Sequence, residues 1–373
     1  MTEWNYNMNT QLILIDKEAP SAAEIQAAAQ IIRAGGLVAF PTETVYGLGG
    51  NALDPTAAAK IYAAKGRPSD NPLIAHIADR EELEELVSEI PAAAEKLMDL
   101  YWPGPMTLVF PKTDKVPYGT TGGLETVAVR MPSHPVARAL IRAAGVPIAA
   151  PSANLSGRPS PTKAEHVFED MDGRIEMILD GGEVGIGLES TIIDVTGEVP
   201  SLLRPGFISE EMLKDVLGQV EVDAASVGPM DPEAQPKAPG MKYRHYAPKA
   251  DMTIIRGDQN QVIKTICDKA ERALGRDQKV GIVCTEESLP VYEERLQSAM
   301  TSAKAGEDDV LHLAVIGSRK DPSTIAHNLF DVLRSFDGMQ VDRIYSESFE
   351  GGQLGDAIMN RLKKAAGYHI VDV

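Results

Sequence analysis

Three polar side chains that could bind phosphate lie close together in one short segment. Lys65 and Arg67 are two residues apart, Asn71 follows, and glycine and proline residues bound the segment. A stiff loop with two cations can hold a polyphosphate, because Arg offers a planar fork of donors and Lys a point charge. A solvated turn explains the same residues equally well. This segment alone leaves both interpretations open.

Hydroxyl-rich loops follow two predicted strands. Residues 40–49 run from a strand into a loop that contains Thr44, and residues 147–157 run from another strand into a loop that contains Ser152 and Asn154. In α/β folds, the loop after the carboxyl end of a strand is the usual position of a ligand. Each loop is weak evidence by itself, since a capped turn has the same composition.

Several catalytic classes lack their signature in this chain. The sequence contains no G-x-x-x-x-G-K-[ST] phosphate loop and no G-x-S-x-G nucleophile elbow. Its seven histidines show no metal-ligand spacing with one another or with the cysteines. The remaining candidates are Arg, Lys, Thr, Ser and Asn side chains. Such a set suits transfer chemistry that depends on positioning and charge neutralisation.

The elements that must position these residues follow an α/β pattern. Up to about residue 210, apolar strand-like runs alternate with helical runs. Ser21 and Glu24 fit a capping box at the start of a helix that ends at Gly35. Further strands are predicted at 12–15, 37–40, 107–110, 126–130, 146–150 and 190–195, and helices at 25–33, 81–100 and 133–144.

The rest of the chain divides into a proline-rich segment and a second α/β region. We predict a catalytic domain at 1–215, a linker or lid at 216–249 and a Rossmann-like domain at 250–373. The second domain should have a small parallel sheet with helices on its faces. Its predicted strands are 252–255, 280–284, 310–316 and 341–346, and its clearest helices are 325–336 and 357–366.

Composition restricts the partners and the compartment. The chain has 373 residues and a formal net charge of −18, and both its first 249 residues and the remainder are acidic. Sequence-independent nucleic-acid binding needs a basic face, so the net charge argues against it as the main activity. No apolar run is long enough to span a membrane and no secretory signal is visible. Cys267 and Cys284 are expected to be reduced core thiols, so we predict a cytoplasmic protein.

Taken together, the motifs resemble the YrdC-type threonylcarbamoyl-AMP synthase family. Seven matching segments occur in order over about 200 residues, and the linker and second α/β domain resemble the long, two-domain branch of that family. The fold implied is a YrdC-like twisted-sheet domain joined to a Rossmann-like one. The segments are 40–47, 65–73, 102–107, 129–132, 151–157, 189–191 and 203–206.

The resemblance implies a nucleotidyltransferase that joins L-threonine, bicarbonate or CO2, and ATP into L-threonylcarbamoyl-AMP and releases pyrophosphate. It also implies Mg2+, held mainly by the ATP phosphates with no metal site of the protein's own. Separate proteins would then transfer the threonylcarbamoyl group to tRNAs that read codons beginning with A, and the synthase itself would need no tRNA.

Matching the motifs residue by residue assigns two groups of side chains. Lys65 and Arg67 are the predicted catalytic residues, and Tyr246, with His245 beside it, is predicted to cover the nucleotide as a lid. ATP is assigned to Lys65, Arg67, Asn71, Thr126, Ser152, Asn154, Ser160, Arg204, His245 and Tyr246. L-Threonine is assigned to Thr44, His76, Arg130, Ala150 and Ser190, with Arg130 pairing with its carboxylate.

Three other functions compete with this one. An RNA-binding module of the same fold would show RNA binding that weakens steeply with salt. A carbamoyl-adenylate-forming domain of hydrogenase maturation shares the fold, but it normally carries zinc-finger and acylphosphatase segments that are not readable here. A nucleotide-binding regulator acting through the second domain lacks the glycine fingerprint after the first strand of that domain.

Overall fold

The computed structural model describes residues 9–228, 230, 234–241, 245–297 and 310–373. Parts of the predicted linker, residues 229, 231–233 and 242–244, lie outside the described residues, as does the amino-terminal octapeptide. The chain divides into two compact units, one of residues 1–156 with 160–243 and one of residues 244–373 with 157–159. Among the described helices, none has both the length and the apolar character that crossing a membrane requires.

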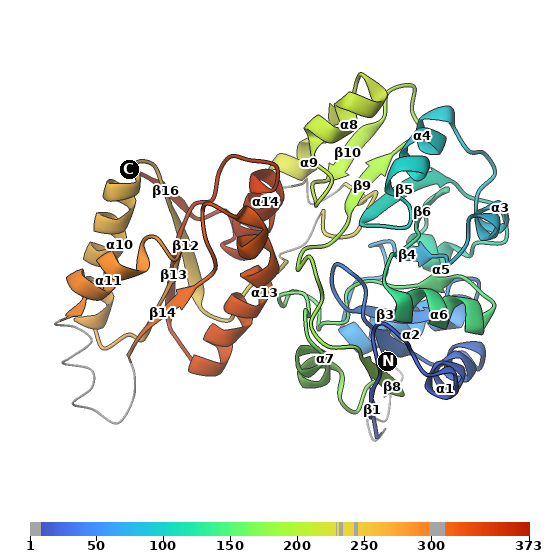
Figure 1. Cartoon of the computed structure of the whole chain (residues 1–373), viewed down its shortest axis with the longest axis horizontal. Coiled ribbons are helices and arrows are strands. Elements are labelled where there is room, and N and C mark those ends of the chain that lie inside the picture. Colours follow the sequence, from blue (N-terminus) through green and yellow to red (C-terminus); the bar gives the residue numbers. More distant parts are fainter. Residues whose placement is uncertain (1–8, 229, 231–233, 242–244, 298–309) are drawn as a thin grey trace. The chain divides into compact units, whose positions relative to one another are not determined.

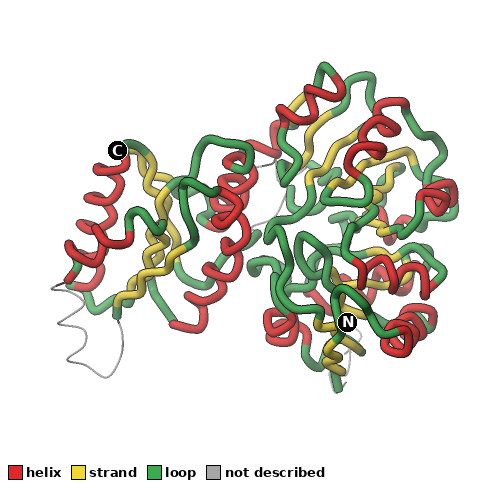
Figure 2. The backbone as a smooth tube through the Cα atoms, viewed as in Figure 1, coloured by secondary structure: helices red, strands yellow, loops and turns green. Residues whose placement is uncertain are grey.

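The first unit is built on a mixed sheet, to which its described residues contribute eleven strands (Figures 1 and 2). The strand order is β1-β8-β2-β3-β7-β4-β6-β5-β9-β10-β11, so the sheet confirms the twisted α/β architecture predicted for this part of the chain. The strands are β1 Gln11–Leu14, β2 Val38–Phe40, β3 Gly47–Asn51, β4 Ile74–His76, β5 Met106–Pro111, β6 Thr126–Arg130, β7 Ile148–Ala149, β8 Met177–Asp180, β9 Thr191–Asp194, β10 Ser201–Arg204 and β11 Glu221–Val222.

Helices cover both faces of this sheet. Helices α1 and α6 pack together on one face, where Ile32 and Leu140 join a core cluster with Phe40. The opposite face carries a larger cluster, to which α2, α4, α7 and α8 contribute. The helices are α1 Ala22–Arg33, α2 Pro55–Lys65, α3 Leu83–Leu86, α4 Ala92–Tyr101, α5 Tyr118–Thr121, α6 Pro135–Ala144, α7 Ala164–Met171, α8 Glu210–Leu217 and α9 Ala224–Val227, with a 3-10 turn at Arg80–Glu82.

Two local predictions for this unit are wrong. The helix expected over 81–100 is divided, because α3 ends at Leu86 and Pro91 lies immediately before α4. Pro cannot donate an amide hydrogen bond to a preceding turn, so a helix restarts after it rather than continuing through it. Ser21 does precede α1, but its side chain accepts no capping hydrogen bond. The expected capping box at Ser21 and Glu24 is therefore not formed.

The second unit confirms the predicted parallel sheet. Its described strands follow the order β14-β13-β15-β12-β16, and all of their pairings are parallel. Helices α10 and α11 lie on one face and α13 and α14 on the other (Figure 1). The elements are β12 Asp251–Arg256, α10 Gln259–Leu274, β13 Val280–Cys284, α11 Leu289–Arg295, β14 Leu311–Val315, α13 Pro322–Met339, β15 Arg343–Glu347, α14 Gly355–Ala365 and β16 Ile370–Asp372.

Both cysteines are free and buried in this second unit, as predicted. Burial raises the pKa of the Cys267 thiol to about 11 and that of Cys284 to about 12. Both thiols are therefore protonated at neutral pH. The thiolate is the form of cysteine that acts as a nucleophile or metal ligand, so we assign these two protonated side chains to the hydrophobic core.

Candidate active site

The cationic loop and the hydroxyl-rich loop are joined by the side chain of Lys65. This residue ends α2, where Gly66 adopts a left-handed conformation that turns the chain away. The Lys65 ammonium group is buried and donates to the backbone oxygens of Ser152 and Asn154, the latter at 2.5 Å. The Ser152 hydroxyl donates in turn to Asn154 Oδ1 at 2.5 Å. Three residues assigned to ATP therefore share one buried hydrogen-bond network.

Arg67 and Asn71 extend this group to the start of β4. Arg67 Nη2 donates to the backbone oxygens of Asn71 and Pro72 at 3.1 and 2.9 Å. The Asn71 side chain is 1% exposed, and neither its amide nitrogen nor its amide oxygen has a hydrogen-bond partner in the described part of the chain. Buried amides are normally satisfied, so an unpaired one needs a physical reason such as a ligand. Asn71 is suited to bind a polar group that enters from outside the protein.

A second polar group lies at the carboxyl end of β6. Arg130 Nη1 donates to Thr44 Oγ1 at 2.9 Å, and Nη2 pairs with Glu43 Oε1 at 2.7 Å. Arg130 and Thr44 are buried, and Glu43 is nearly so. Two edges of the guanidinium are thus fixed, which points it in one direction and offsets its charge.

His76 stands beside Arg130 on the neighbouring strand. The two residues are register partners in the parallel pair β4 and β6, so their side chains leave the same face of the sheet. Burial, and then the charge of Arg130, lower the pKa of His76 to about 3. His76 is therefore neutral at physiological pH. It can donate or accept one hydrogen bond but cannot supply positive charge.

The polar row continues across the next strands. Thr107 of β5 is the antiparallel register partner of Arg130 and bonds to Ser190 Oγ at 2.7 Å. Arg204 of β10 donates from Nη2 to the same Ser190 hydroxyl and from Nε to the Ser190 carbonyl. Ser160 donates to the Glu189 carboxylate, one residue before Ser190. Arg204, which is assigned to ATP, therefore contacts Ser190, which is assigned to L-threonine. Ser160, also assigned to ATP, contacts the residue before Ser190.

Thr126, assigned to ATP, and Arg130, assigned to threonine, lie at opposite ends of one strand. Thr126 begins β6 and Arg130 ends it, so the two residues lie about 13 Å apart along the strand. Ala150 donates its backbone N–H to Ile74 at the start of β4. Thr126 and Ala150 thus lie toward the Asn71 end. The assignment of Ala150 to threonine stays a prediction.

Buried apolar side chains lie on the same face of the sheet as His76, Arg130 and Thr107. Ile74, Ala128 and Val109 are buried there two residues along their strands from His76, Arg130 and Thr107. Residues of the predicted linker cover them, because Ala238 and Met241 belong to the same buried cluster. Arg204 Nη1 also donates to the Pro239 carbonyl. This part of the linker is packed on the catalytic sheet.

The two residues predicted to form a lid belong to the other unit. The Tyr246 ring is buried and stacks on Phe330 of α13 with ring centres 5.1 Å apart. The His245 ring is 5.4 Å from that of Tyr246, and the guanidinium of Arg361 lies 6.0 Å from the Tyr246 ring centre. The lid role assigned to this pair stays a prediction.

Three site residues were not assigned a role by the sequence. Glu43 holds Arg130, Thr107 bonds Ser190, and Glu189 accepts from Ser160. Each lies inside a motif that the sequence singled out, so the signal was present. The sequence did not show that Glu43 pairs with Arg130, because the two residues are 87 positions apart in the chain.

Two family models match the chain, one on each unit. The Sua5/YciO/YrdC model, described as "Telomere recombination", matches residues 30–206. A Sua5 C-terminal model, described as "Threonylcarbamoyl-AMP synthase, C-terminal domain", matches residues 208–367.

Relatives from distant organisms match over nearly the whole chain. A protein of Bacillus subtilis named threonylcarbamoyl-AMP synthase is 48% identical and covers 95% of this chain and 96% of its own. One of Pyrococcus abyssi with the same name is also 48% identical and covers 97% and 99%. A crystal structure of P. abyssi Sua5 complexed with L-threonine has a TM-score of 0.87, 47% identity and coverage of 98% and 100%. The chain therefore belongs to the threonylcarbamoyl-AMP synthase family, in its two-domain Sua5 form.

Proposed function

We propose that this chain joins L-threonine, bicarbonate or CO2, and ATP into L-threonylcarbamoyl-AMP and pyrophosphate. The amine of threonine forms a bond to the carbon of CO2 and releases a proton to solvent, or reacts with bicarbonate and releases water, which gives a carbamate. A carbamate oxygen then forms a bond to the α-phosphorus of ATP while the bond from that phosphorus to the bridging oxygen of pyrophosphate breaks. The transferred group is an adenylyl group, so the enzyme is a nucleotidyltransferase.

One observation carries this proposal: cationic and amide groups lie just before β4, and a fixed guanidinium lies at the end of the neighbouring strand β6. The ATP phosphates fit the first group, where Lys65 and Arg67 bring positive charge and Asn71 offers an unpaired amide among the described residues. Charge that develops on the leaving pyrophosphate is stabilised by such preorganised donors. Lys65 and Arg67 are accordingly the proposed catalytic residues.

L-Threonine fits the second group. Arg130 would pair with its carboxylate, while Thr44, His76 and Ser190 provide neutral hydrogen-bonding groups around it. His76 is neutral, so it adds no charge that would repel Arg130 and can hydrogen-bond to the amino acid. The complex of P. abyssi Sua5 with L-threonine supports a threonine site in this fold.

Magnesium is part of the proposal as a companion of ATP. Asn154 and Ser160, both assigned to ATP, carry oxygen donors of the hard kind that Mg2+ takes. When bound to the triphosphate, the ion would neutralise charge on the departing pyrophosphate. The protein's own residues would position the nucleotide.

The product is a labile mixed anhydride, so it must be consumed by other proteins. We propose that these proteins transfer the threonylcarbamoyl group to tRNA, that the synthase itself requires no tRNA, and that it works in the cytoplasm. Exclusion of water from the filled site would limit hydrolysis of the product. The Tyr246 lid is proposed to serve this purpose.

Pyrophosphate release tests the function directly. Purified protein is supplied with ATP, Mg2+ and bicarbonate, and each amino acid is added in turn. Release should depend on threonine, with serine slower by roughly 10- to 200-fold, because one methyl group against an apolar wall contributes only about 1–3 kcal/mol. Equal release with every amino acid would contradict the proposal. Salt-sensitive RNA binding without amino-acid dependence would favour the RNA-binding module.

A further inference from the structure

A basic pocket lies in the second unit, and none of the residues that line it is assigned to the reaction. It has a volume of about 300 Å3 and lies between the end of α10 and the start of strands β12 and β15. Lys269, Arg272 and Arg276 line it from the helix side, and Arg343 lines it from β15. Among the described residues that line it, none is Asp or Glu. The pocket thus gathers four cations in a chain whose net charge is −18.

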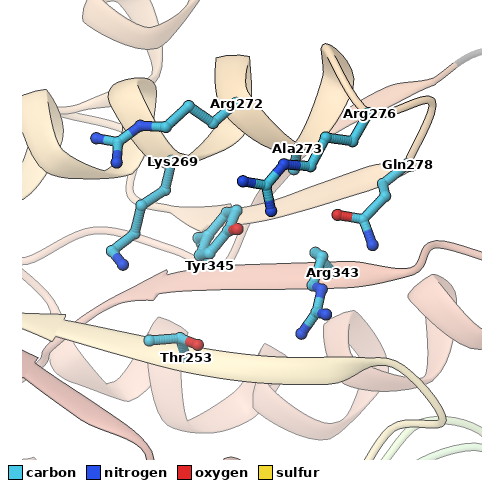
Figure 3. A pocket seen from close by; sticks show the side chains of 8 residues that line it. All are labelled: Thr253, Lys269, Arg272, Ala273, Arg276, Gln278, Arg343 and Tyr345. Atoms are coloured by element: carbon cyan, nitrogen blue, oxygen red, sulfur yellow. The ribbon is translucent and has the colours of Figure 1, made fainter.

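The fold itself brings these cations together. Lys269, Arg272 and Arg276 follow one another at intervals of three and four residues, which places them on one side of α10 and the turn after it. Arg343 comes from a strand 67 residues further along than Arg276. Figure 3 shows Lys269 and Arg272 on one side of the Tyr345 ring, and Arg276 and Arg343 on the other. Like charges repel at such a convergence, so it costs free energy unless an anion is present.

Ordinary structural roles account for part of the cluster. Arg272 lies in the last turn of α10 and Arg276 two residues after the helix, where cations interact favourably with the helix dipole. Arg343 pairs with Asp251 at 2.8 Å, and both side chains are largely exposed. Lys269 lies more than one turn before the end of α10, so the helix dipole does not explain its position. No such role explains why all four groups line one pocket.

Neutral hydrogen-bonding groups complete the lining. Thr253 and Tyr345 are register partners on β12 and β15, so they point to the same face of the sheet, the face covered by α10. The Tyr345 ring is half-buried, and burial raises the pKa of its hydroxyl. This hydroxyl stays protonated at neutral pH and can donate to an oxygen atom. The pocket therefore combines charge with neutral donors, as small-molecule sites commonly do.

We propose that this pocket binds a diphosphate group, either free pyrophosphate or the polyphosphate tail of a nucleotide. Guanidinium forks match the paired oxygens of phosphate, and two adjacent phosphates offer enough anionic oxygens for four cations. The concave shape of the pocket and the acidic net charge of the chain favour a compact ligand over a long nucleic-acid backbone. This binding is independent of the synthase reaction, whose residues all lie elsewhere.

Acetylation of lysine provides a readout that is local to the pocket. In the full-length chain, the rate of Lys269 acetylation is measured by mass spectrometry, with exposed Lys264 of the same helix as internal reference. The probes are inorganic pyrophosphate, ADP, orthophosphate and a short single-stranded RNA. We expect pyrophosphate to slow modification of Lys269 at least about fivefold and to leave Lys264 unchanged. Protection by ADP as well identifies a nucleotide tail, and protection by pyrophosphate alone identifies the free anion.

The double variant R272Q/R276Q supplies the specificity control. Both arginines are exposed, so folding should be retained, and R276Q alone serves if the double variant is unstable. Pyrophosphate affinity at the pocket should fall at least about tenfold, while threonine-dependent pyrophosphate release stays within twofold. No protection by any probe, equal protection by orthophosphate, or protection by RNA alone would overturn the proposal. Each of these results would leave the synthase function untouched.

Discussion

The ammonium group of Lys65 donates to the backbone oxygen of Asn154 at 2.5 Å, across 89 residues of sequence. This bond joins the end of α2 to the loop that follows β7. Two loops that look unrelated in the sequence thus form one wall of a single site. Because Lys65 is buried, its position is fixed by backbone oxygens rather than by solvent. The protein's own hydrogen bonds therefore hold the proposed phosphate-binding end of the site in place.

Replacement of Asn71 separates a ligand-binding role from a structural one. Its buried amide has no partner among the described residues, so Asn71→Leu should leave the free energy of unfolding unchanged or raise it. The KM for ATP should rise at least about tenfold, because a phosphate loses its donor. Asn51→Leu is the matched control, since Asn51 Oδ1 accepts from the Leu53 N–H. The control should lose about 1 kcal/mol of stability and keep its KM for ATP. A stability loss in N71L with normal ATP kinetics would contradict the assignment.

Arg130→Lys tests the threonine end of the site. Lys keeps the charge but cannot hold Thr44, Glu43 and a carboxylate in the geometry of the planar fork. The KM for threonine should therefore rise at least about tenfold, with the KM for ATP changed less than threefold. Arg142→Lys, which alters an exposed pair with Asp79, should change neither constant. Parallel increases in both constants of R130K would place Arg130 outside a dedicated threonine site.

The neutral His76 predicts a pH dependence of stability. Its pKa is about 3 in the folded protein and near the ordinary value of 6.5 in the unfolded chain. Between these pH values the unfolded state binds a proton that the folded state does not. The stability that neutral His76 provides is therefore complete above pH 6.5 and is lost as the pH falls toward 3. The slope from His76 is at most about 1.4 kcal/mol per pH unit. Denaturant unfolding of the wild type and His76→Gln between pH 5 and 7 measures it. Identical slopes in the two proteins would show that His76 is not the group responsible.

The proposed lid role of Tyr246 predicts a defect in ATP kinetics that an equally destabilising substitution elsewhere does not cause. Tyr246→Ala should raise the KM for ATP or release more hydrolysed product, while Tyr246→Phe keeps the ring and should preserve both. Both Tyr246→Ala and Phe330→Ala remove one member of the buried ring pair, so each should cost about 3–5 kcal/mol. F330A is thus the control for stability. If F330A shows the same ATP defect as Y246A, the lid role of Tyr246 is excluded.

The sequence predicted the elements better than their partners. Strands at 126–130 and 280–284 agree with β6 and β13, because compact apolar runs bounded by turn residues identify buried strands. The helix predicted over 81–100 is wrong, because α3 ends at Leu86 and α4 begins only after Pro91. Motif residues were found because their types are conspicuous. The position of each motif residue in the site depends on the order of the strands in the sheet. Local sequence patterns do not encode that order.

Long-range pairing limited the prediction of the site in the same way. Glu43 was visible in its motif, yet nothing in its neighbourhood indicates a buried ion pair with Arg130. The basic pocket is a similar case, because three of its cations are spaced along α10 but Arg343 joins them only through the strand order of the second unit. Assignment of 157–159 to the second unit also depends on distant contacts, such as the bond from Arg334 to the Pro159 carbonyl. Such contacts are set by packing of the whole fold.

A crystal structure with a nonhydrolysable ATP analogue and L-threonine bound together tests the central claim most directly. The account predicts phosphate oxygens within hydrogen-bonding distance of Lys65 or Arg67 and of the Asn71 amide, and the threonine carboxylate on Arg130. The two ligands should meet over the face shared by β4 and β6. Phosphates bound elsewhere, or threonine and nucleotide in cavities that do not connect, would contradict it.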